Sequence, residues 1–482
     1  MAEAIKKKRI LIYSLVFSPD GVSTAYLYND LALGFQKRGY EVCVLTTTPH
    51  FNLIEGALNK QPLQKRFLGL FYQSDFNAIK VFHIPLKKHK STLLRMLSFI
   101  YWHKMSFFVG LFLKRPDVIL TPSPPLTSGL LAILLAKLKG AKTIYNVQEI
   151  YPDLLINHGR LTNPVIIKFL KILEGWVYNW SDAITTIDQN FYNTIKTRIK
   201  NLDKLKIISN FVDTELYKTS SAVPLPKVFK KIKGKTDMVY AGNIGIAQEW
   251  DLVINLAKAI KKLPITIWII GEGVKKKYLE SQIKKHKLFN IQLLPYQERK
   301  YMPVINLFAD FHFIAMNKSM EHDGFPSKVY TIMSSGKPMV VVSSDQTPIV
   351  SFLEQTKAAL TVTNHSLTDF KKAVLKLEAD KDLRNTLGTN GRKVVEQKFN
   401  KQVVIKKYIK LAEDRILGYR NFITKIWNAI KFCEINECKN LDLDIAQAKN
   451  TFNVWILNEL NNTEQSVKLA IENYKFKDKS GK

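Results

Sequence analysis

A lone lysine stands at the start of an expected helix in the stretch Asp323–Ser344, DGFPSKVYTIMSSGKPMVVVSS. A glycine and Pro326 precede Lys328, and a second glycine and proline stop the helical run before a β-branched run. A cation in the first turn of a helix is unfavourable with the helix dipole. Because a bound anion would offset this cost, we expect Ser327, Lys328 and free backbone N–H groups to hold a diphosphate. The alternative is a proline-started helix with an exposed lysine.

Two further glycine-containing turns follow expected strands in the same half of the chain. The stretch VYAGNIGIAQEW places Gly242, Asn243 and Gly245 directly after one strand, and IIGEGV places Gly271 and Gly273 after another. Glycine lets backbone N–H groups approach a phosphate, and the positive end of the following helix points at it. Ordinary strand-to-helix turns also favour glycine, but three such exits could line one crevice.

The composition favours anionic partners. The 482-residue chain has 72 lysines and arginines against 41 aspartates and glutamates, a formal net charge of +31. Phosphates, nucleic acid and the anionic face of a membrane all attract such a protein. Its lysines are scattered and no nucleic-acid recognition module is present, so we expect no nucleic-acid partner.

The three cysteines indicate neither a disulfide framework nor a metal site. Cys433 and Cys438 lack the usual zinc spacing, and Cys43 is far away. Three cysteines fit a reducing cytoplasm. No His/Cys cluster indicates zinc, so we expect no metal.

Two apolar segments have some features of targeting or membrane elements. The N-terminus has basic residues before an apolar run, but this run is short, lacks a small-residue cleavage site and is typical of a first strand. The segment Ser91–Leu113 is interrupted by Arg95, His103 and Lys104, so its uncharged runs are shorter than the roughly 20 residues of a span. We expect a helix lying on an anionic membrane surface, with a core helix exposing one edge as the alternative.

Short β-rich runs alternate with helical runs along most of the chain, which predicts doubly wound parallel sheets. The first half has seven such runs: Arg9–Phe17, Glu41–Thr48, Ile79–Leu86, Asp117–Pro122, Lys142–Glu149, Asp182–Asp188 and Lys206–Val212. After a linker at Ala222–Lys235, six more follow: Asp237–Asn243, Ile265–Glu272, Ile291–Pro295, Phe311–Met316, Met339–Ser344 and Ala359–Thr363. Two sheets of one class therefore suggest a ligand cleft between two domains, at the carboxyl ends of the strands.

The motifs YAGNIG, IIGEGV, FPSKVYTIMSSGKP and ISNFVDTELY together resemble family 4 retaining glycosyltransferases of the GT-B fold. In the first half, GVSTAYLYNDLALGFQKRGYEVCVLTTTPHFN and YNVQEIYPDLLINHG resemble a bacterial subgroup of fucosamine- and fucose-type transferases of surface polysaccharide synthesis. The resemblance covers about Lys8 to Leu417. It implies two Rossmann-like doubly wound domains facing across a cleft.

The resemblance also implies an organisation of the chain. Residues 1–220 would form the acceptor-binding domain and 221–400 the nucleotide-sugar-binding domain. A helix at 401–418 would return toward the first domain, and residues 419–482 would form a helical extension of unknown role.

Residue roles follow from the matched motifs. The implied catalytic residues are Glu149, Lys328 and Asp323. In the second domain, substrate-binding positions would be Gly242, Asn243, Gly245, Gly273, Tyr296, Glu321, Gly324, Phe325, Pro326, Ser327 and Thr331. In the first domain they would be Ser18, Asp20 and Gly21 of the first exit loop, and His50. A histidine at a strand end is more often a local hydrogen-bond partner, and so is the aspartate at Asp188.

Two departures from the family pattern weaken the donor contacts. Many members carry two glutamates seven residues apart, where this chain has Asp323 and Thr331, so the usual ribose contact is missing. The Arg or Lys that usually follows the first glycine loop is also absent, and Gln248 and Glu249 stand nearby. Lys328 is left as the main identifiable cation for the leaving group.

The expected reaction needs no metal. Departure of a nucleoside diphosphate develops negative charge on its outer phosphate, which Lys328 and preorganised N–H groups would stabilise. The resemblance implies front-face attack by the acceptor hydroxyl, with Glu149 orienting the acceptor or accepting its proton. The alternative for Glu149 is a structural carboxylate capping the YPD turn.

The sequence leads to one preferred function and two alternatives. We expect a sugar, an N-acetylated hexosamine or deoxyhexose, to pass from a UDP-sugar, favoured over a GDP-sugar, to a polyprenyl-diphosphate-linked glycan at the cytoplasmic membrane face. A nucleotide-sugar 2-epimerase of the same fold would need no membrane and no acceptor. A non-catalytic partner of another transferase would fit the two motif departures.

Overall fold

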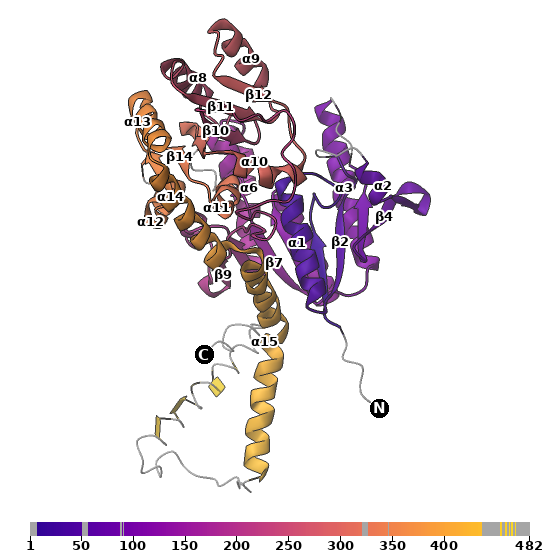
Figure 1. Ribbon diagram of the computed structural model, residues 1–482. Helices are drawn as coiled ribbons and strands as arrows, with labels where there is room; N and C mark the ends of the chain where they lie inside the picture. Colours follow the sequence, from indigo (N-terminus) through magenta and orange to yellow (C-terminus); the bar gives the residue numbers. More distant parts are fainter. Residues whose placement is uncertain are drawn as a thin grey trace. The chain divides into compact units, whose positions relative to one another are not determined.

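The computed structural model describes residues 7–50, 56–86, 89, 91–320, 326–345 and 347–435, together with residues 454, 455, 458, 459, 462, 464, 465 and 468. The chain divides into two compact units, Met1–Leu417 and Gly418–Lys482, which are described separately. The first unit contains two parallel sheets with helices on their faces (Figure 1).

The first sheet has nine strands in the order β3-β4-β5-β2-β1-β6-β7-β8-β9. Their bounds are β1 Arg9–Tyr13, β2 Glu41–Thr47, β3 Gln64–Arg66, β4 Phe71–Phe76, β5 Ile79–Ile84, β6 Val118–Ser123, β7 Lys142–Val147, β8 Ala183–Thr186 and β9 Leu205–Ile207. Strand β4 pairs antiparallel with both β3 and β5, and the other pairs are parallel. The seven predicted runs are all strands, and β3 and β4 form a hairpin at the edge that was not predicted.

Helices cover both faces of the first sheet. They are α1 Ser23–Lys37, α2 Ala57–Lys60, α3 Thr92–Phe112, α4 Leu126–Lys139, α5 Asp153–Asn157, α6 Pro164–Trp180 and α7 Gln189–Lys196. One face packs Ile10, Ile12 and Val44 against Tyr28 and Leu31 of α1. The opposite face is covered by α3, α4, α6 and α7, because alternate residues of each strand point to opposite sides.

The second sheet has six parallel strands in the order β12-β11-β10-β13-β14-β15. Their bounds are β10 Thr236–Ala241, β11 Ile265–Ile270, β12 Ile291–Leu294, β13 Phe311–Ala315, β14 Met339–Val342 and β15 Ala359–Val362. Its helices are α8 Trp250–Ala259, α9 Lys276–Lys285, α10 Met302–Phe308, α11 Lys328–Ser334, α12 Pro348–Thr356, α13 Leu367–Ala379 and α14 Lys381–Val394. Strands β11, β13 and β14 are buried at every residue, as parallel strands covered on both faces are. All six predicted strands are confirmed.

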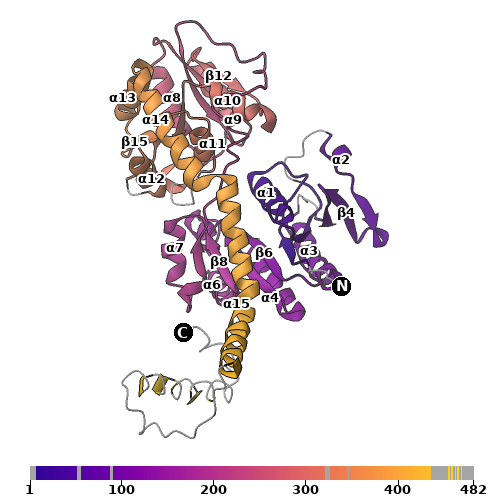
Figure 2. The same cartoon turned by 60° about the horizontal axis from the view of Figure 1, so that its bottom comes forward.

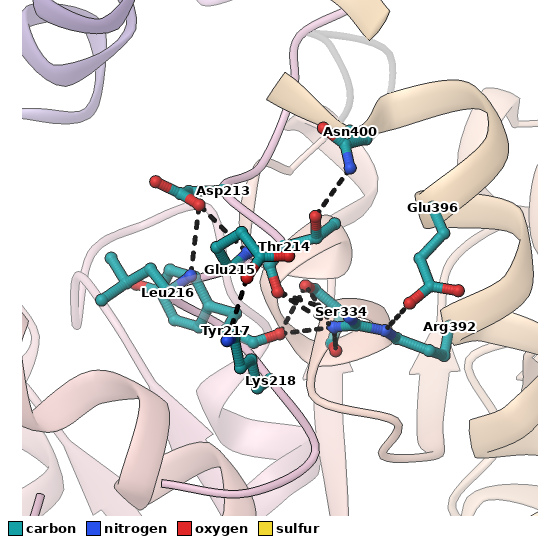
Figure 3. A network of polar contacts seen from close by, with 10 residues as sticks. All are labelled: Asp213, Thr214, Glu215, Leu216, Tyr217, Lys218, Ser334, Arg392, Glu396 and Asn400. Atoms are coloured by element: carbon teal, nitrogen blue, oxygen red, sulfur yellow. Dashed lines mark hydrogen bonds and ion pairs between the residues drawn. The ribbon is translucent and has the colours of Figure 1, made fainter. Parts of the chain in front are cut away.

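The segment ISNFVDTELY connects the two sheets and is fixed to the second domain by one arginine (Figure 3). The guanidinium of Arg392, in α14, donates to the carbonyl oxygens of Tyr217, at 2.6 Å, and of Ser334. The Asn400 side chain donates to the Thr214 hydroxyl at 2.8 Å. These contacts hold the connecting segment against the second domain.

Helix α15, Lys401–Ile435, begins after the second sheet and packs its first turns on the first one. Val404 and Ile405 join the cluster beneath α1, and the Tyr408 hydroxyl accepts a hydrogen bond of 2.8 Å from Asn146 in β7. In the described part of the chain, no helix is both long and apolar enough to cross a membrane.

Candidate active site

Lys328 is the first residue of α11 and lies against the glycine turn that follows β10. Its ammonium nitrogen is 3.8 Å from the centre of the Tyr240 ring. Gly242 has φ +150°, and a Cβ there would lie 2.9 Å from the same nitrogen. The positive φ favours glycine at this strand exit, and any side chain here would have to displace the ammonium of Lys328. The structure thus brings together two of the three turns singled out in the sequence.

The ammonium of Lys328 stands in an environment that disfavours its charge. Removal from water lowers the pKa of Lys328 to about 7. The face of the Tyr240 ring attracts the cation, but no carboxylate forms an ion pair with it among the residues that the structure describes. A bound anion would supply the missing partner and raise the pKa of Lys328.

The glycine turn itself is held by two aromatic side chains of the core. The Tyr240 hydroxyl donates to the Asn243 carbonyl oxygen at 2.7 Å, and the Trp250 indole N–H donates to the Gly245 carbonyl oxygen at 2.8 Å. Gly242 and Asn243 are exposed, whereas Gly245 is buried. Sequence reasoning missed Tyr240 and Trp250, although an aromatic residue just before a strand-end glycine was a visible signal.

The glycine turn that follows β11, IIGEGV, packs on the glycine turn that follows β10. A Cβ on Gly271 would lie 1.9 Å from the Gly242 carbonyl oxygen, and one on Gly273 would lie 2.3 Å from the Ile244 carbonyl oxygen. The Ile244 N–H donates to the Glu272 carbonyl oxygen at 2.8 Å. The glycines of IIGEGV therefore allow two loops to touch through their backbones. The base-binding role of Gly273 stays a prediction.

Ser327 occupies the N-cap position of α11, but its side chain makes no capping hydrogen bond. Its backbone is already helical, with φ −58° and ψ −24°, whereas a capping residue usually has an extended backbone. The Pro326 carbonyl oxygen accepts from the Val329 N–H, and the Thr331 hydroxyl donates back to the Lys328 carbonyl oxygen at 2.9 Å. Ser327 is exposed, so its hydroxyl is accessible to a ligand.

Four predicted site residues, Glu321, Asp323, Gly324 and Phe325, lie outside the described residues.

Glu249, near which the sequence lacks the usual family cation, makes an ion pair of its own. Glu249 is paired with His365 at 2.5 Å between Oε2 and Nδ1. Gln248 and Glu249 line a hollow of about 260 Å³ together with Lys275 and Tyr278. The departure from the family pattern at this place stays a prediction.

Tyr296 and Arg299 lie where the second domain meets α1. Tyr296 is half exposed. Its pKa is raised mainly by burial and to a smaller extent by the nearby Tyr26, whereas the positive charge of Arg299 lowers it. The Arg299 guanidinium carbon is 3.7 Å from the centre of the Tyr26 ring. This cation–π contact joins the two domains within the first unit.

In the first domain, the loops after β1 and β2 hold one another. The Ser18 hydroxyl donates to Gln61 at 2.7 Å, and the Asp20 carboxylate accepts from the His50 N–H at 2.9 Å. The His50 ring lies 2.7 Å, Nδ1 to oxygen, from the Thr48 carbonyl. The structure thus brings together Ser18, Asp20 and His50, with Gly21 beside them, and their contact with substrate stays a prediction.

Glu149 follows β7 and is anchored through its backbone. The Ser123 hydroxyl donates to the Glu149 carbonyl oxygen at 2.7 Å. Glu149 is half buried. The pKa of Tyr151 is raised first by the burial of Tyr151 itself and next by the negative charge of Glu149. Asp188, by contrast, caps α7, because its carboxylate accepts from the Phe191 N–H at 2.8 Å. Within the described residues, no group of three His, Cys, Asp or Glu side chains is placed to hold a metal ion.

Comparison with protein families gives two matches. Residues 24–199 match the family described as "Glycosyl transferase 4-like domain", and residues 225–394 match "Glycosyl transferases group 1". The colanic acid biosynthesis glycosyl transferase WcaI of Escherichia coli (strain K12) is 23% identical over 362 residues, which cover 72% of this chain and 86% of that protein.

Solved structures share the fold. HepE of Anabaena in complex with UDP-glucose has a TM-score of 0.61 and 14% identity, and the match covers 84% of this chain and 98% of HepE. Sucrose-phosphate synthase of Thermosynechococcus elongatus has a TM-score of 0.62 and 12% identity, over 87% of this chain and 100% of that one. Both confirm two facing domains of the GT-B type.

A short stretch is similar to an unrelated class of enzyme. The valine–tRNA ligase of Agrobacterium fabrum is 50% identical over 74 residues, which are 15% of this chain and only 8% of the ligase.

Proposed function

Since the chain belongs to the glycosyltransferases of the GT-B fold, we propose that it transfers a sugar from a UDP-sugar to a lipid-linked acceptor with retention of configuration. The similarity to WcaI, a colanic acid biosynthesis enzyme, supports a role in bacterial polysaccharide synthesis. The UDP-glucose complex of HepE supports a nucleotide-sugar donor, and we propose UDP rather than GDP as its nucleotide. The sugar we propose is an N-acetylated hexosamine or deoxyhexose.

One observation carries this proposal, namely the ammonium of Lys328 beside Gly242. A desolvated cation without a carboxylate among the described residues is unfavourable in the free protein. A diphosphate at the exit of β10 supplies the opposite charge. As the bond from the anomeric carbon to the diphosphate oxygen breaks, negative charge grows on the outer phosphate, and Lys328 stabilises it in the transition state.

The acceptor hydroxyl then forms the new bond on the face that the leaving group vacates. Its proton passes to a base, for which we propose Glu149 or the departing phosphate oxygen. Ser18, Asp20, Gly21 and His50 border this reaction centre in the proposal. No metal ion takes part in the scheme, because Lys328 meets the developing charge.

The place of action that we propose is the cytoplasmic face of the cell membrane. A polyprenyl-diphosphate glycan keeps its lipid in the bilayer, so the enzyme must bring its first domain to the surface. Helix α3, the predicted segment 91–113, supports this proposal because Leu93, Met96 and Leu97 are each more than half exposed to solvent.

Nucleotide release from a panel of UDP- and GDP-sugars tests the function. The panel is run with and without a membrane extract that contains lipid-linked glycans. We expect release of UDP from one donor only when the extract is present. Conversion of the sugar without an acceptor would instead indicate an epimerase. No turnover with any donor, while UDP still raises the melting temperature, would indicate a non-catalytic partner.

A further inference from the structure

Helix α6 exposes an apolar stripe that no interaction within the described chain explains. Residues 165, 169, 172, 176 and 180 recur at helical spacing along one side of this helix. Val165 is 74% exposed, Phe169 62% and Trp176 46%. The opposite side buries Leu173 and Val177 in the core, so α6 is apolar on two faces, and only one is used in packing.

The stripe on α6 continues across α4 to α3. Helix α4 packs against both neighbours, since a Cβ on Gly110 of α3 would lie 2.7 Å from Leu135, and one on Gly129 would lie 2.8 Å from Val177 of α6. The three helices lie side by side on the same face of the first sheet (Figure 2). Helix α4 adds the exposed side chains of Leu134 and Leu138. Their neighbours on α3 are Leu93, Leu94, Met96, Leu97, Ile100, Phe108, Leu111 and Phe112.

The charges around this surface have one sign. Across α3, α4 and α6, Glu174 is the sole acidic residue, and it is buried and paired with Arg198 at 2.6 Å. The basic residues on these helices include the exposed Lys104 and Lys168, and Lys137, whose ammonium lies 4.6 Å from the centre of the Trp180 ring. Trp176 and Trp180 stack with their ring centres 5.5 Å apart. Apolar side chains rimmed by lysines and tryptophans match the boundary of an anionic bilayer.

A second copy of the chain is a poorer occupant. A two-fold dimer places the same patch on itself, so the lysines of one copy would face those of the other with no exposed acidic side chain on these helices. An anionic lipid surface offers the opposite charge across the whole patch. Charge complementarity therefore selects the membrane.

We propose that α6 and the C-terminal end of α4 form, with α3, one membrane-binding surface whose ligand is an anionic lipid bilayer. The inference rests on the proposed function in one respect, that a lipid-linked acceptor requires the enzyme to reach the membrane. The inference adds that α3 forms only one part of the membrane contact, and that α6 and α4 form the other part. The stripe of α6 dips into the headgroup region, and Lys137 and Lys168 bind the lipid phosphates.

The test replaces exposed residues of α6 by the triple change Phe169→Ser, Ile172→Ser and Trp176→Ser. Because these side chains are already exposed, the fold is expected to persist, which the affinity for UDP checks. The matched control is Val274→Ser with Phe289→Ser, since these side chains are 80% and 79% exposed in the second domain. Sedimentation with vesicles of phosphatidylethanolamine and phosphatidylglycerol is the readout, and vesicles of phosphatidylcholine alone test the need for anionic lipid.

We expect the α6 variant to bind anionic vesicles at least about tenfold more weakly than the control, with unchanged affinity for UDP. A variant of α3, Leu93→Ser with Leu97→Ser, is measured in the same vesicle assay. It separates the membrane contact of α3, which the proposed function needs, from the contact of α6, which the inference adds. Loss of vesicle binding in the α3 variant alone would overturn the inference and leave the function standing. A wild-type dimer that the α6 changes dissociate, without an effect on vesicle binding, would overturn it in favour of a second copy.

Discussion

The loops at the exits of the two sheets differ in how their polar side chains are paired. In the first domain, the Ser18 hydroxyl bonds to a neighbouring side chain and the Asp20 carboxylate accepts the His50 N–H. In the second domain, the ammonium of Lys328 lies over the Tyr240 ring, with no ion pair among the described residues. The polar groups of the first set bond to one another, whereas the ammonium of the second has no carboxylate partner among the residues that the structure describes.

The physical cost of the two arrangements differs. A hydrogen-bonded polar group is nearly neutral for stability, and losing its partner is what costs free energy. A desolvated cation without an opposite charge costs free energy in the folded protein until a ligand binds. Changes in the first loops should therefore act on stability, and changes at Lys328 should act on binding and turnover.

The largest expected effect comes from Lys328→Ala. Loss of one transition-state donor lowers turnover by about 100-fold or more, while the fold is kept. Initial rates of UDP release with the membrane extract measure it. The control is Lys337→Ala, because burial also lowers the pKa of Lys337 at the other end of α11, away from the glycine turn. Near-normal turnover in the Lys328 variant would remove the diphosphate role.

In the first domain, Asp20→Ala should instead lower stability. The partly buried His50 N–H loses its acceptor, the buried Asp20 carboxylate, so we expect unfolding to become easier by about 1–3 kcal/mol. Urea unfolding measures this change, and the affinity for UDP should stay near that of the wild type. A weakened affinity for UDP with unchanged stability would reverse the contrast between the two regions.

The free energy of unfolding should also depend on pH through Lys328. Its pKa of about 7 in the folded protein lies below the roughly 10.4 of an unfolded lysine, so the unfolded chain binds more protons between these values. Stability of the wild type relative to Lys328→Met should rise as the pH increases from about 7 toward 10. Urea midpoints of both proteins at a series of pH values give the difference. A flat difference would place the ammonium in water.

The smallest effect is expected from deletion of residues 421–482. This part lies beyond the unit Met1–Leu417 and beyond the two family matches, so turnover and affinity for UDP should change by no more than about twofold. Kinetics of the shortened protein measure it. A large loss of turnover would show that residues 421–482 take part in transfer.

Sequence reasoning placed the sheets well because buried parallel strands are short apolar runs between turns. Strand β13, for example, is buried at every residue. The hairpin of β3 and β4 was missed because Gln64–Arg66 is polar and exposed along its length. Its pairing comes from the neighbouring strand rather than from its own composition.

The site was predictable in its charge but not in its surroundings. Lys328 and Gly242 come together because parallel strands share an exit edge, which the sequence pattern indicates. The Tyr240 ring beneath the ammonium and the missing cap of Ser327 depend on tertiary packing and local backbone angles. The outer stripe of α6 was missed because an apolar helix has the same pattern whether its second face meets a core or a membrane.

Calorimetry of UDP binding tests the poised lysine most directly. Titrations at about pH 8, in buffers of different ionisation enthalpy, give the number of protons bound with the nucleotide. Because Lys328 has a pKa of about 7 in the free protein and a diphosphate raises it, the wild type should take up close to one proton. Lys328→Arg, which is always charged, should bind UDP without this uptake. Wild-type binding with no proton uptake would contradict the account.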